Sequence, residues 1–236
     1  MAHDSLAARM KGYEQSFRTT FPRRMPIIIR VDGRAFHTYT RPLKDRFNEF
    51  VTAAMNLSAF TLFKEIQGAQ LAYVQSDEIS LLVHGYKRFN SESWYDNQLQ
   101  KMVSVAAGIA SATFTSQSQY IFNECKPAVF DARAFIVPEA DVCNYFLWRQ
   151  QDAVRNSVQM LARSLRSHKE CTGLNVGDLK EMCKDANSPW EELPTRLQRG
   201  LCVKRDKTGT ICYDHCIPLF NEDRDYVNNL LNLEEA

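Results

Sequence analysis

The stretch Pro26-Ile27-Ile28-Ile29-Arg30-Val31-Asp32-Gly33 decides the fold of this 236-residue chain. Its β-branched run predicts a buried strand, and Asp32-Gly33 predicts a tight turn directly after it. The three isoleucines form the longest strongly apolar stretch, which is far too short to cross a membrane. Residues 1–24 contain no apolar run of the signal-peptide type. We therefore expect a soluble, cytoplasmic protein with no membrane partner.

The composition is that of an ordinary globular protein, with 44% hydrophobic and 24% charged residues and a net charge of +1. The net charge of the whole chain therefore does not indicate a nucleic-acid binder. A local basic patch could still exist on a chain with so small a net charge. The seven cysteines include no Cys-x-x-Cys pair. Cys212 and Cys216, with His215 between them, come nearest to metal-ligand spacing. Free thiols of a reducing compartment are the simpler interpretation, and a zinc site is the alternative.

Apolar spacing outlines the elements on both sides of the first strand. Residues 1–24 predict a helix that ends at Pro22, with apolar residues at three- and four-residue spacing. Residues 44–66, 94–118 and 139–168 also show helical spacing. Residues 71–74 and 79–83 predict two strands of a hairpin, joined by Ser76-Asp77-Glu78. Residues 132–137 predict a strand that ends before Pro138.

This order of elements predicts an α+β fold, the βαββαβ pattern of a ferredoxin-like sheet and of many polymerase palms. We expect an antiparallel or mixed sheet with helices on one face. We divide the chain into an N-terminal helix or arm (1–25), a palm-like catalytic domain (26–168) and a C-terminal extension (169–236). The extension is expected to be loop-rich, above all at 170–200, and to pack on the palm.

Asp32 and Asp77 are the candidate catalytic residues. Asp32 ends the first strand and Asp77 lies at the tip of the hairpin. Neighbouring antiparallel strands of a ferredoxin-like sheet bring these two positions to the same edge. Paired carboxylates are the ligands that Mg²⁺ prefers, commonly shared with substrate phosphates. The alternative is that each is only a turn residue, since Asp is common in turns.

Several blocks of sequence then point to one family. The chain strongly resembles the tRNA-His guanylyltransferase family, whose members add nucleotides in the 3′-to-5′ direction. The resemblance covers about residues 26–157. The blocks are Arg30-Val31-Asp32-Gly33-Arg34-Ala35-Phe36-His37, Ser76-Asp77-Glu78, Ser104-Val105-Ala106-Ala107-Gly108-Ile109-Ala110-Ser111, Phe130-Asp131-Ala132-Arg133 and Asn144-Tyr145-Phe146-Leu147-Trp148-Arg149-Gln150.

The resemblance implies a palm-like catalytic domain with two Mg²⁺ ions per active site and ATP or GTP as substrates. The implied metal ligands are Asp32, the carbonyl of Gly33, and Asp77. The implied nucleotide-binding residues are Asp32, Gly33, Arg34, Ala35, Phe36, His37, Lys44, Ser76 and Asp77. We expect Glu78 to support the site or to be neutral, and His37 to contact the nucleotide without acting as an acid or base. The family also implies a homotetramer, for which the N-terminal helix is a candidate interface.

Several further residues have a functional and a structural interpretation. Lys87 and Lys101 are either triphosphate contacts or surface lysines. Trp148 is expected in the core, and Asp131 with Arg133 in a structural salt bridge or at the substrate. Arg149 and Asn156 either meet the RNA end or support the active site. The other candidate RNA contacts are Arg196, Arg199, Lys204, Arg205 and Lys207 in the C-terminal extension, together with Arg18, Arg23 and Arg24.

The chain departs from the eukaryotic members at one place. Those proteins carry a His-Ile-Asn-Asn-Leu-Tyr-Asn run after the Trp-Arg-Gln block, and here the stretch is Val154-Arg155-Asn156-Ser157-Val158-Gln159-Met160. The chain is similar to the guanylyltransferase-like branch of bacteria and archaea, which implies template-dependent repair of tRNA 5′ ends, with ATP or GTP activating a 5′-monophosphate. The alternatives are addition of the extra 5′ guanosine to tRNA-His, a palm-fold nucleotidyl cyclase acting without RNA, and a non-catalytic RNA-binding protein.

Overall fold

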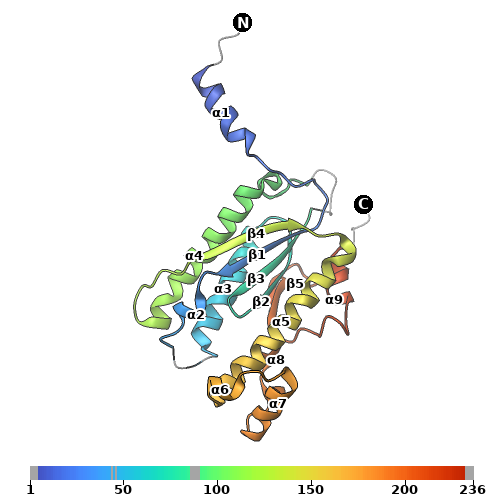
Figure 1. The fold of residues 1–236 in the computed structure, drawn as a ribbon. Helices are drawn as coiled ribbons and strands as arrows, with labels where there is room; N and C mark the ends of the chain where they lie inside the picture. The colour runs from blue at the N-terminus through green and yellow to red at the C-terminus, as the bar shows by residue number, and fades with distance from the viewer. Residues whose placement is uncertain (1–4, 44, 46, 86–90, 232–236) are drawn as a thin grey trace.

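A six-stranded antiparallel sheet forms the centre of the computed structural model, which describes residues 5–43, 45, 47–85 and 91–231 (Figure 1). The strand order is β4-β1-β3-β2-β5-β6. The strands are β1 (Ile27–Gly33), β2 (Ala69–Gln75), β3 (Glu78–Val83), β4 (Phe130–Ile136), β5 (Leu201–Arg205) and β6 (Ile211–Asp214). Strands β4, β1, β3 and β2 have the ferredoxin-like order that the sequence predicts, so β1 is an internal strand between β4 and β3.

Both faces of the sheet are covered, because β1 is apolar on both sides. Ile27, Ile29 and Val31 belong to one core cluster, together with residues of α3 (Glu49–Glu65) and α4 (Leu99–Phe122). Ile28 belongs to a second cluster with residues of α5 (Glu139–Leu165). The expected arrangement of helices on one face holds for α3 and α4, whereas α5 lies on the opposite face. A strand buried on both sides reads as a continuous apolar run, as here.

Local signals set the ends of the main helices. The side chain of Asn48 caps α3 by accepting a hydrogen bond from the Val51 amide. The helix α4 begins at Leu99, later than predicted, because Tyr95 and Asp96 adopt left-handed conformations inside a short 3-10 turn (Trp94–Asn97). Asn123, also left-handed, follows the last residue of α4.

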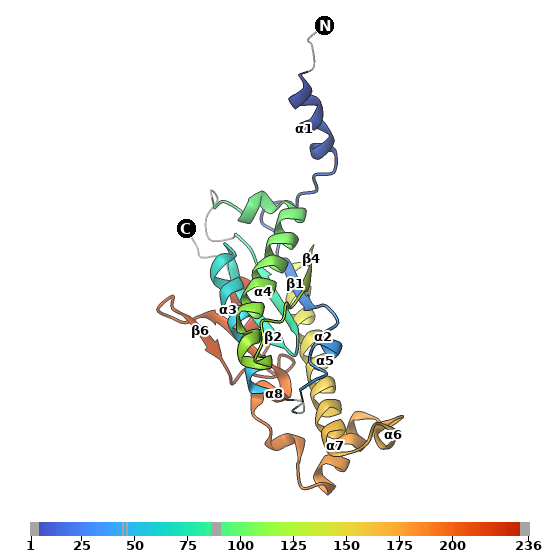
Figure 2. The same ribbon diagram turned by 90° about the vertical axis from the view of Figure 1, so that its left-hand side faces the viewer.

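The first helix, α1 (Leu6–Ser16), extends away from the sheet (Figures 1 and 2). None of its residues is buried. It ends at Ser16, earlier than the predicted end at Pro22. Its apolar stripe, namely Leu6, Met10 and Tyr13 with Phe17 just beyond, is exposed.

The residues after 168 are more ordered than the sequence suggested. Where loops were expected at 170–200, the structure has α6 (His168–Cys171), α7 (Val176–Asp185), a 3-10 turn (Trp190–Glu192) and α8 (Thr195–Arg199). These pack on the second half of α5 through a cluster that includes Trp190, Leu179 and Val158. The indole N–H of Trp190 donates to Ser157 Oγ at 3.0 Å, which fixes this unit to α5.

The rest of the C-terminal extension joins the sheet itself. β5 pairs with β2, and β6 pairs with β5. Beyond them lie α9 (Asp225–Asn228) and a final 3-10 turn (Asn229–Leu231). The remaining short helix, α2 (Phe36–Tyr39), belongs to the turn that follows β1. No helix in the described ranges has the length and apolar character needed to cross a bilayer.

Candidate active site at the ends of β1 and the β2–β3 hairpin

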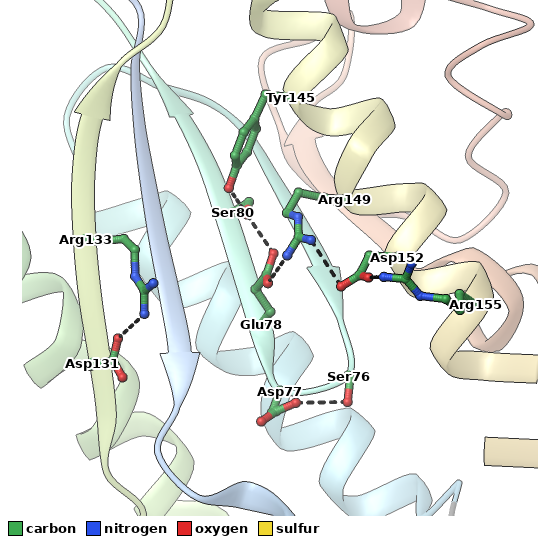
Figure 3. Close-up of polar contacts among 10 residues, drawn as sticks. All are labelled: Ser76, Asp77, Glu78, Ser80, Asp131, Arg133, Tyr145, Arg149, Asp152 and Arg155. Atoms are coloured by element: carbon green, nitrogen blue, oxygen red, sulfur yellow. Dashed lines mark hydrogen bonds and ion pairs between the residues drawn. The ribbon is translucent and has the colours of Figure 1, made fainter. Parts of the chain in front are cut away.

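Asp32 and Asp77 meet at one end of the sheet, as the strand order predicts. Asp32 is paired across from Glu78 in the β1–β3 ladder. The amide of Gly33 donates to the carbonyl of Asp77 at 2.9 Å, which joins the end of β1 to the hairpin turn. Ser76, in a left-handed conformation with φ 49°, makes that turn and donates its hydroxyl to Asp77 Oδ1 at 3.0 Å. Figure 3 shows Ser76 and Asp77 at the tip of the hairpin.

The two carboxylates carry like charges, which repel one another when both groups are ionised. Burial raises the pKa of Asp77, and the hydrogen bond from the Ser76 hydroxyl partly offsets this rise. The negative charge of Asp32 makes a smaller contribution that also raises the pKa. Burial also raises the pKa of Asp32, and the guanidinium of Arg30 lowers it. Ionising both groups therefore costs free energy in the protein alone. A bound divalent cation would remove that cost, so the donor set fits a hard metal ion.

The described part of the chain holds no group of three or more His, Cys, Asp and Glu side chains placed to bind a metal, so no third such side chain joins Asp32 and Asp77. A metal ion at this pair would therefore depend on two carboxylates, a backbone carbonyl and substrate oxygens. The same finding speaks against the zinc alternative at Cys212, His215 and Cys216.

The turn after β1 is held by aromatic packing. A Cβ on Gly33 would lie 2.3 Å from the ring of Phe36, so only glycine leaves room for that ring. Phe36 is buried and contacts Phe114 and Phe130. Ala35 has a left-handed backbone with φ 54°. The turn therefore has one defined shape, with Arg34, Ala35 and His37 exposed at its surface.

A cavity of about 350 Å³ opens beside Asp77. This volume lies in the range of small-molecule sites, roughly 300–1,000 Å³. Phe36 and His37 from the β1 turn, Ser76 and Asp77 from the hairpin, and Asn156 from α5 line it. Further polar lining comes from the start of α3 and from α8, namely Asn48, Thr52, Asn56, Arg196 and Gln198.

A buried ion-pair network supports the hairpin from α5 (Figure 3). Arg149 Nη1 lies 2.8 Å from Glu78 Oε2, and Arg149 Nη2 lies 3.1 Å from Asp152 Oδ2. Glu78 also accepts from Ser80 Oγ at 3.2 Å. Arg149 and Glu78 are each 6% exposed. Because Glu78 directly follows Asp77, the network fixes the backbone that carries the candidate metal ligand.

Comparison with known proteins points to one family. A family model described as tRNAHis guanylyltransferase matches residues 7–138. The chain belongs to the tRNA-His guanylyltransferase family. A bacterial tRNA-His guanylyltransferase-like protein solved in complex with ATP is 39% identical, with a TM-score of 0.92 over 97% of this chain and 100% of that one. A second, in complex with GTP, is 35% identical, with a TM-score of 0.83 over the same shares.

The match to eukaryotic relatives is shorter. A probable tRNA-His guanylyltransferase of Dictyostelium discoideum is 27% identical over 56% of this chain and 52% of its own length. The chain thus spans about half the length of the curated tRNA-His guanylyltransferases it matches.

The candidate RNA contacts lie in different environments, and most of them are already engaged in contacts within the protein. Asn156 is exposed and lines the cavity. The buried ion pairs of Arg149 argue against its RNA role. Arg199 donates to the Ile217 carbonyl at 3.0 Å, Lys204 pairs with Asp214 at 2.8 Å, and Arg205 donates to the Gly209 carbonyl at 3.0 Å. The last three contacts hold the C-terminal extension together.

Several other residues are singled out by the sequence. Lys44 and Lys87 lie outside the described residues, whereas Lys101, Asp131 and Arg133 lie within them. Lys101 is exposed on α4, with its ammonium 5.9 Å from the Tyr95 ring centroid. Asp131 and Arg133 form an exposed ion pair at 3.0 Å.

Sequence reasoning missed the side of the cavity that α8 supplies. Gly200 has φ +86°, and a Cβ there would lie 2.3 Å from the Val74 carbonyl oxygen. This close approach brings α8, with Gln198, against β2. A glycine directly before the apolar run Leu201-Cys202-Val203 was the available signal.

Proposed function

We propose that the protein is a template-dependent 3′-to-5′ nucleotidyltransferase that repairs the 5′ end of tRNA. The observation that carries the proposal is the Asp32–Asp77 carboxylate pair, of which Asp77 lines a cavity of about 350 Å³. The ATP and GTP named for the two bacterial relatives support the same use of the cavity here. The family-based homotetramer stays a prediction, and the exposed stripe of α1 is its candidate interface.

Two Mg²⁺ ions fit the carboxylate pair. Asp32, Asp77 and the carbonyl of Gly33 would hold them. When bound, such ions lower the pKa of an attacking hydroxyl and stabilise a leaving phosphate group.

The chain's own groups bind and orient the substrates. The cavity takes the nucleoside, and the turn formed by residues 34–37 with the Ser76 hydroxyl faces the triphosphate. The family resemblance implies that Lys44 contacts the same nucleotide. Arg149 and Glu78 hold Asp77 in place. Each of these roles is positional, which suits phosphoryl chemistry, where orientation and electrostatics supply most of the rate.

The proposed reaction has two displacements at phosphorus. In the first, an oxygen of the RNA 5′-monophosphate attacks the α-phosphorus of ATP or GTP, and pyrophosphate leaves. In the second, the 3′-hydroxyl of an incoming triphosphate attacks the activated RNA 5′ phosphorus, and AMP or GMP leaves. The incoming nucleotide then forms the new 5′ end and keeps its triphosphate.

Repair is favoured over tRNA-His-specific addition by the stretch 154–160 in the middle of α5. Asn156 lines the cavity there, and Ser157 is buried and donates to the Leu197 carbonyl at 2.6 Å. Ser157 thus ties α5 to α8 where the eukaryotic relatives carry another residue type. We infer that a template base selects the incoming nucleotide, while protein contacts follow the shape and phosphates of the RNA.

The test is 5′-end extension of tRNAs with and without their first nucleotide, with each triphosphate supplied alone. Addition is expected only where a template base pairs with the incoming nucleotide. Guanosine addition restricted to tRNA-His would support the specific alternative, and a cyclic nucleotide formed without RNA would support a cyclase.

Two variants test the site itself. Asp32→Asn and Asp77→Asn are expected to abolish addition while the protein stays folded. The matched control is Asp96→Asn, which neutralises an exposed carboxylate in the turn before α4 and should keep activity. Full addition activity of both site variants would refute the proposed site. RNA binding without addition, in the wild type as in the variants, would instead support a non-catalytic RNA-binding role.

A further inference from the structure

Trp148 occupies an unusual place for a tryptophan. Its residue is 53% exposed, whereas Trp94 and Trp190 are each 8% exposed. The sequence prediction that Trp148 lies in the core is therefore wrong. Exposed large aromatic side chains are common where bases or partners bind, because one ring face stays free for contact.

The indole of Trp148 is held in a fixed position. The guanidinium of Arg149 lies 3.8 Å from its ring centroid, and the ring of Tyr145 meets it edge-on at 6.0 Å. Arg149 is itself anchored by Glu78, the neighbour of Asp77. The exposed ring is thus linked through two side chains to the backbone of the candidate active site.

Cationic side chains continue along the same side of α5. Arg155 and Arg163 lie seven and fifteen positions after Trp148, which keeps the three residues within about a third of a turn of one another on the helix. Arg166 directly follows Leu165, the last residue of α5. The Arg155 side chain is 57% exposed, and Arg163 and Arg166 are exposed. At 1.5 Å per residue, the part of α5 from Trp148 to Leu165 extends over roughly 26 Å, and Arg166 follows directly.

Few carboxylates neutralise this row. Asp152 pairs with both Arg149 and Arg155. Among the described residues, no carboxylate lies within ion-pair distance of Arg163 or Arg166, although Glu170 is near enough to Arg166 to feel its charge. The row therefore keeps positive charge at its distal end.

We propose that this row, Trp148 with Arg155, Arg163 and Arg166, binds the RNA substrate next to the reacting end. We name it the α5 platform. Trp148 stacks on a nucleobase and the arginines contact phosphates. The inference rests on the proposed function, since it takes the reacting end to lie at Asp32 and Asp77.

The chemistry of the platform favours RNA over a second copy of the chain. In a two-fold interface centred on the platform, each arginine row would face the same row of the partner. Stacking on an indole and contacts to phosphates are also tolerant of sequence. An enzyme that takes its instruction from a template needs such tolerance.

Tryptophan fluorescence tests the stacking directly. Because Trp148 is the one exposed tryptophan, acrylamide quenching reports mainly on it. A tRNA with a 5′-monophosphate is expected to quench its emission and protect it from acrylamide, and ATP alone should not. Trp148→Phe should lose this signal. Protection that depends on protein concentration without RNA would overturn the proposal in favour of a second copy.

Steady-state extension assays give the second readout. Trp148→Ala should raise the KM for tRNA roughly 5- to 150-fold, as loss of one base–aromatic stack implies, with the KM for ATP unchanged. Trp148→Phe should recover part of the loss. Arg163→Glu should weaken tRNA binding and lower its salt dependence by about one phosphate contact. Lys64→Glu is the control with the same charge change, on α3 at the other face of the sheet.

The outcomes separate the two proposals. If the wild type extends tRNA but Trp148→Ala and Arg163→Glu match Lys64→Glu in KM for tRNA, the α5 platform is wrong and the proposed function stands. If the wild type binds tRNA with Trp148 protection but never extends it, the platform stands and the proposed function is wrong.

Discussion

Replacing Arg149 by Met tests whether the buried ion pair holds the hairpin that carries Asp77. Met keeps an unbranched apolar stem but lacks the guanidinium. Among the described residues, Glu78, which is 6% exposed, then keeps only the Ser80 hydroxyl as a side-chain partner. Removing one member of a buried pair costs about 3–5 kcal/mol, because the remaining charge is uncompensated. We take about 3 kcal/mol, since Ser80 still donates to Glu78. For a chain of this size that lowers Tm by roughly 6–12 °C.

The assay is a double-mutant cycle read by thermal and urea unfolding, with Arg149→Met, Glu78→Gln and the two combined. Glu78→Gln removes the charge that Arg149→Met leaves unpaired, so the double variant should be more stable than the sum of the single changes implies. We expect a coupling free energy of at least about 1 kcal/mol. In parallel, kcat of Arg149→Met should fall roughly ten- to hundredfold, with little change in the KM for ATP, because a small misplacement of Asp77 suffices for that loss.

Two results would refute this reasoning. A coupling below about 0.5 kcal/mol would show that the 2.8 Å pair does not support the fold. A normal kcat in a correctly folded Arg149→Met variant would show that the position of Asp77 does not depend on the pair.

Three other changes follow from the geometry of the site. Burial, with a smaller contribution from the charge of Asp32, raises the pKa of Asp77 above 3.8. Its ionisation therefore costs stability as pH rises from the unfolded-state pKa through the folded one. Above that window, Asp77→Asn should raise the Tm of the metal-free protein in EDTA, and a lower Tm there would contradict the pKa argument. Mg²⁺ is expected to raise the Tm of the wild type, and the variant should lose this effect. Gly33→Ala places a Cβ 2.3 Å from the Phe36 ring and should cost about 1–3 kcal/mol in urea unfolding. Gly200→Ala should cost more, because the obstacle is the Val74 carbonyl and φ is +86°, and unchanged stability would show that β2 and the chain before β5 are not in close contact.

The meeting of Asp32 and Asp77 was predictable because it depends only on strand order. A β-branched run, a hairpin and two helices at regular spacing specify the ferredoxin-like core, and that core sets which strand ends are neighbours. The observed β1–β3 pairing of Asp32 with Glu78 confirms the prediction. No knowledge of side-chain packing was needed for it.

The cavity wall depends on pairings that leave little trace in the sequence. β5 has five residues and pairs with β2 over three positions, from Ala72 to Val74. A strand that short resembles many apolar segments of loops and helices. Its place is decided by contacts with residues more than a hundred positions earlier, such as the 2.6 Å hydrogen bond from the Tyr73 hydroxyl to the Arg199 carbonyl.

Trp148 shows a second limit. It ends the run Tyr145-Phe146-Leu147-Trp148, in which four large apolar residues point to all sides of a helix. Helical periodicity alone cannot assign a buried face to such a run. The buried face follows from where α5 crosses the sheet, which places Phe146 in the core and Trp148 outside.

The same crossing explains why support of the site and contact with RNA are expected from one helix. Residues of α5 that face the sheet, above all Arg149, reach the hairpin, whereas those one step around the helix remain exposed. A template-reading enzyme must hold its catalytic carboxylates rigidly while it accepts many RNA sequences. On α5, the rigid part is a buried ion pair and the tolerant part is an aromatic ring with a row of arginines. Because Arg149 contacts both Glu78 and the Trp148 ring, a change at Arg149 should disturb catalysis and RNA affinity together, whereas a change at Arg163 should disturb affinity alone.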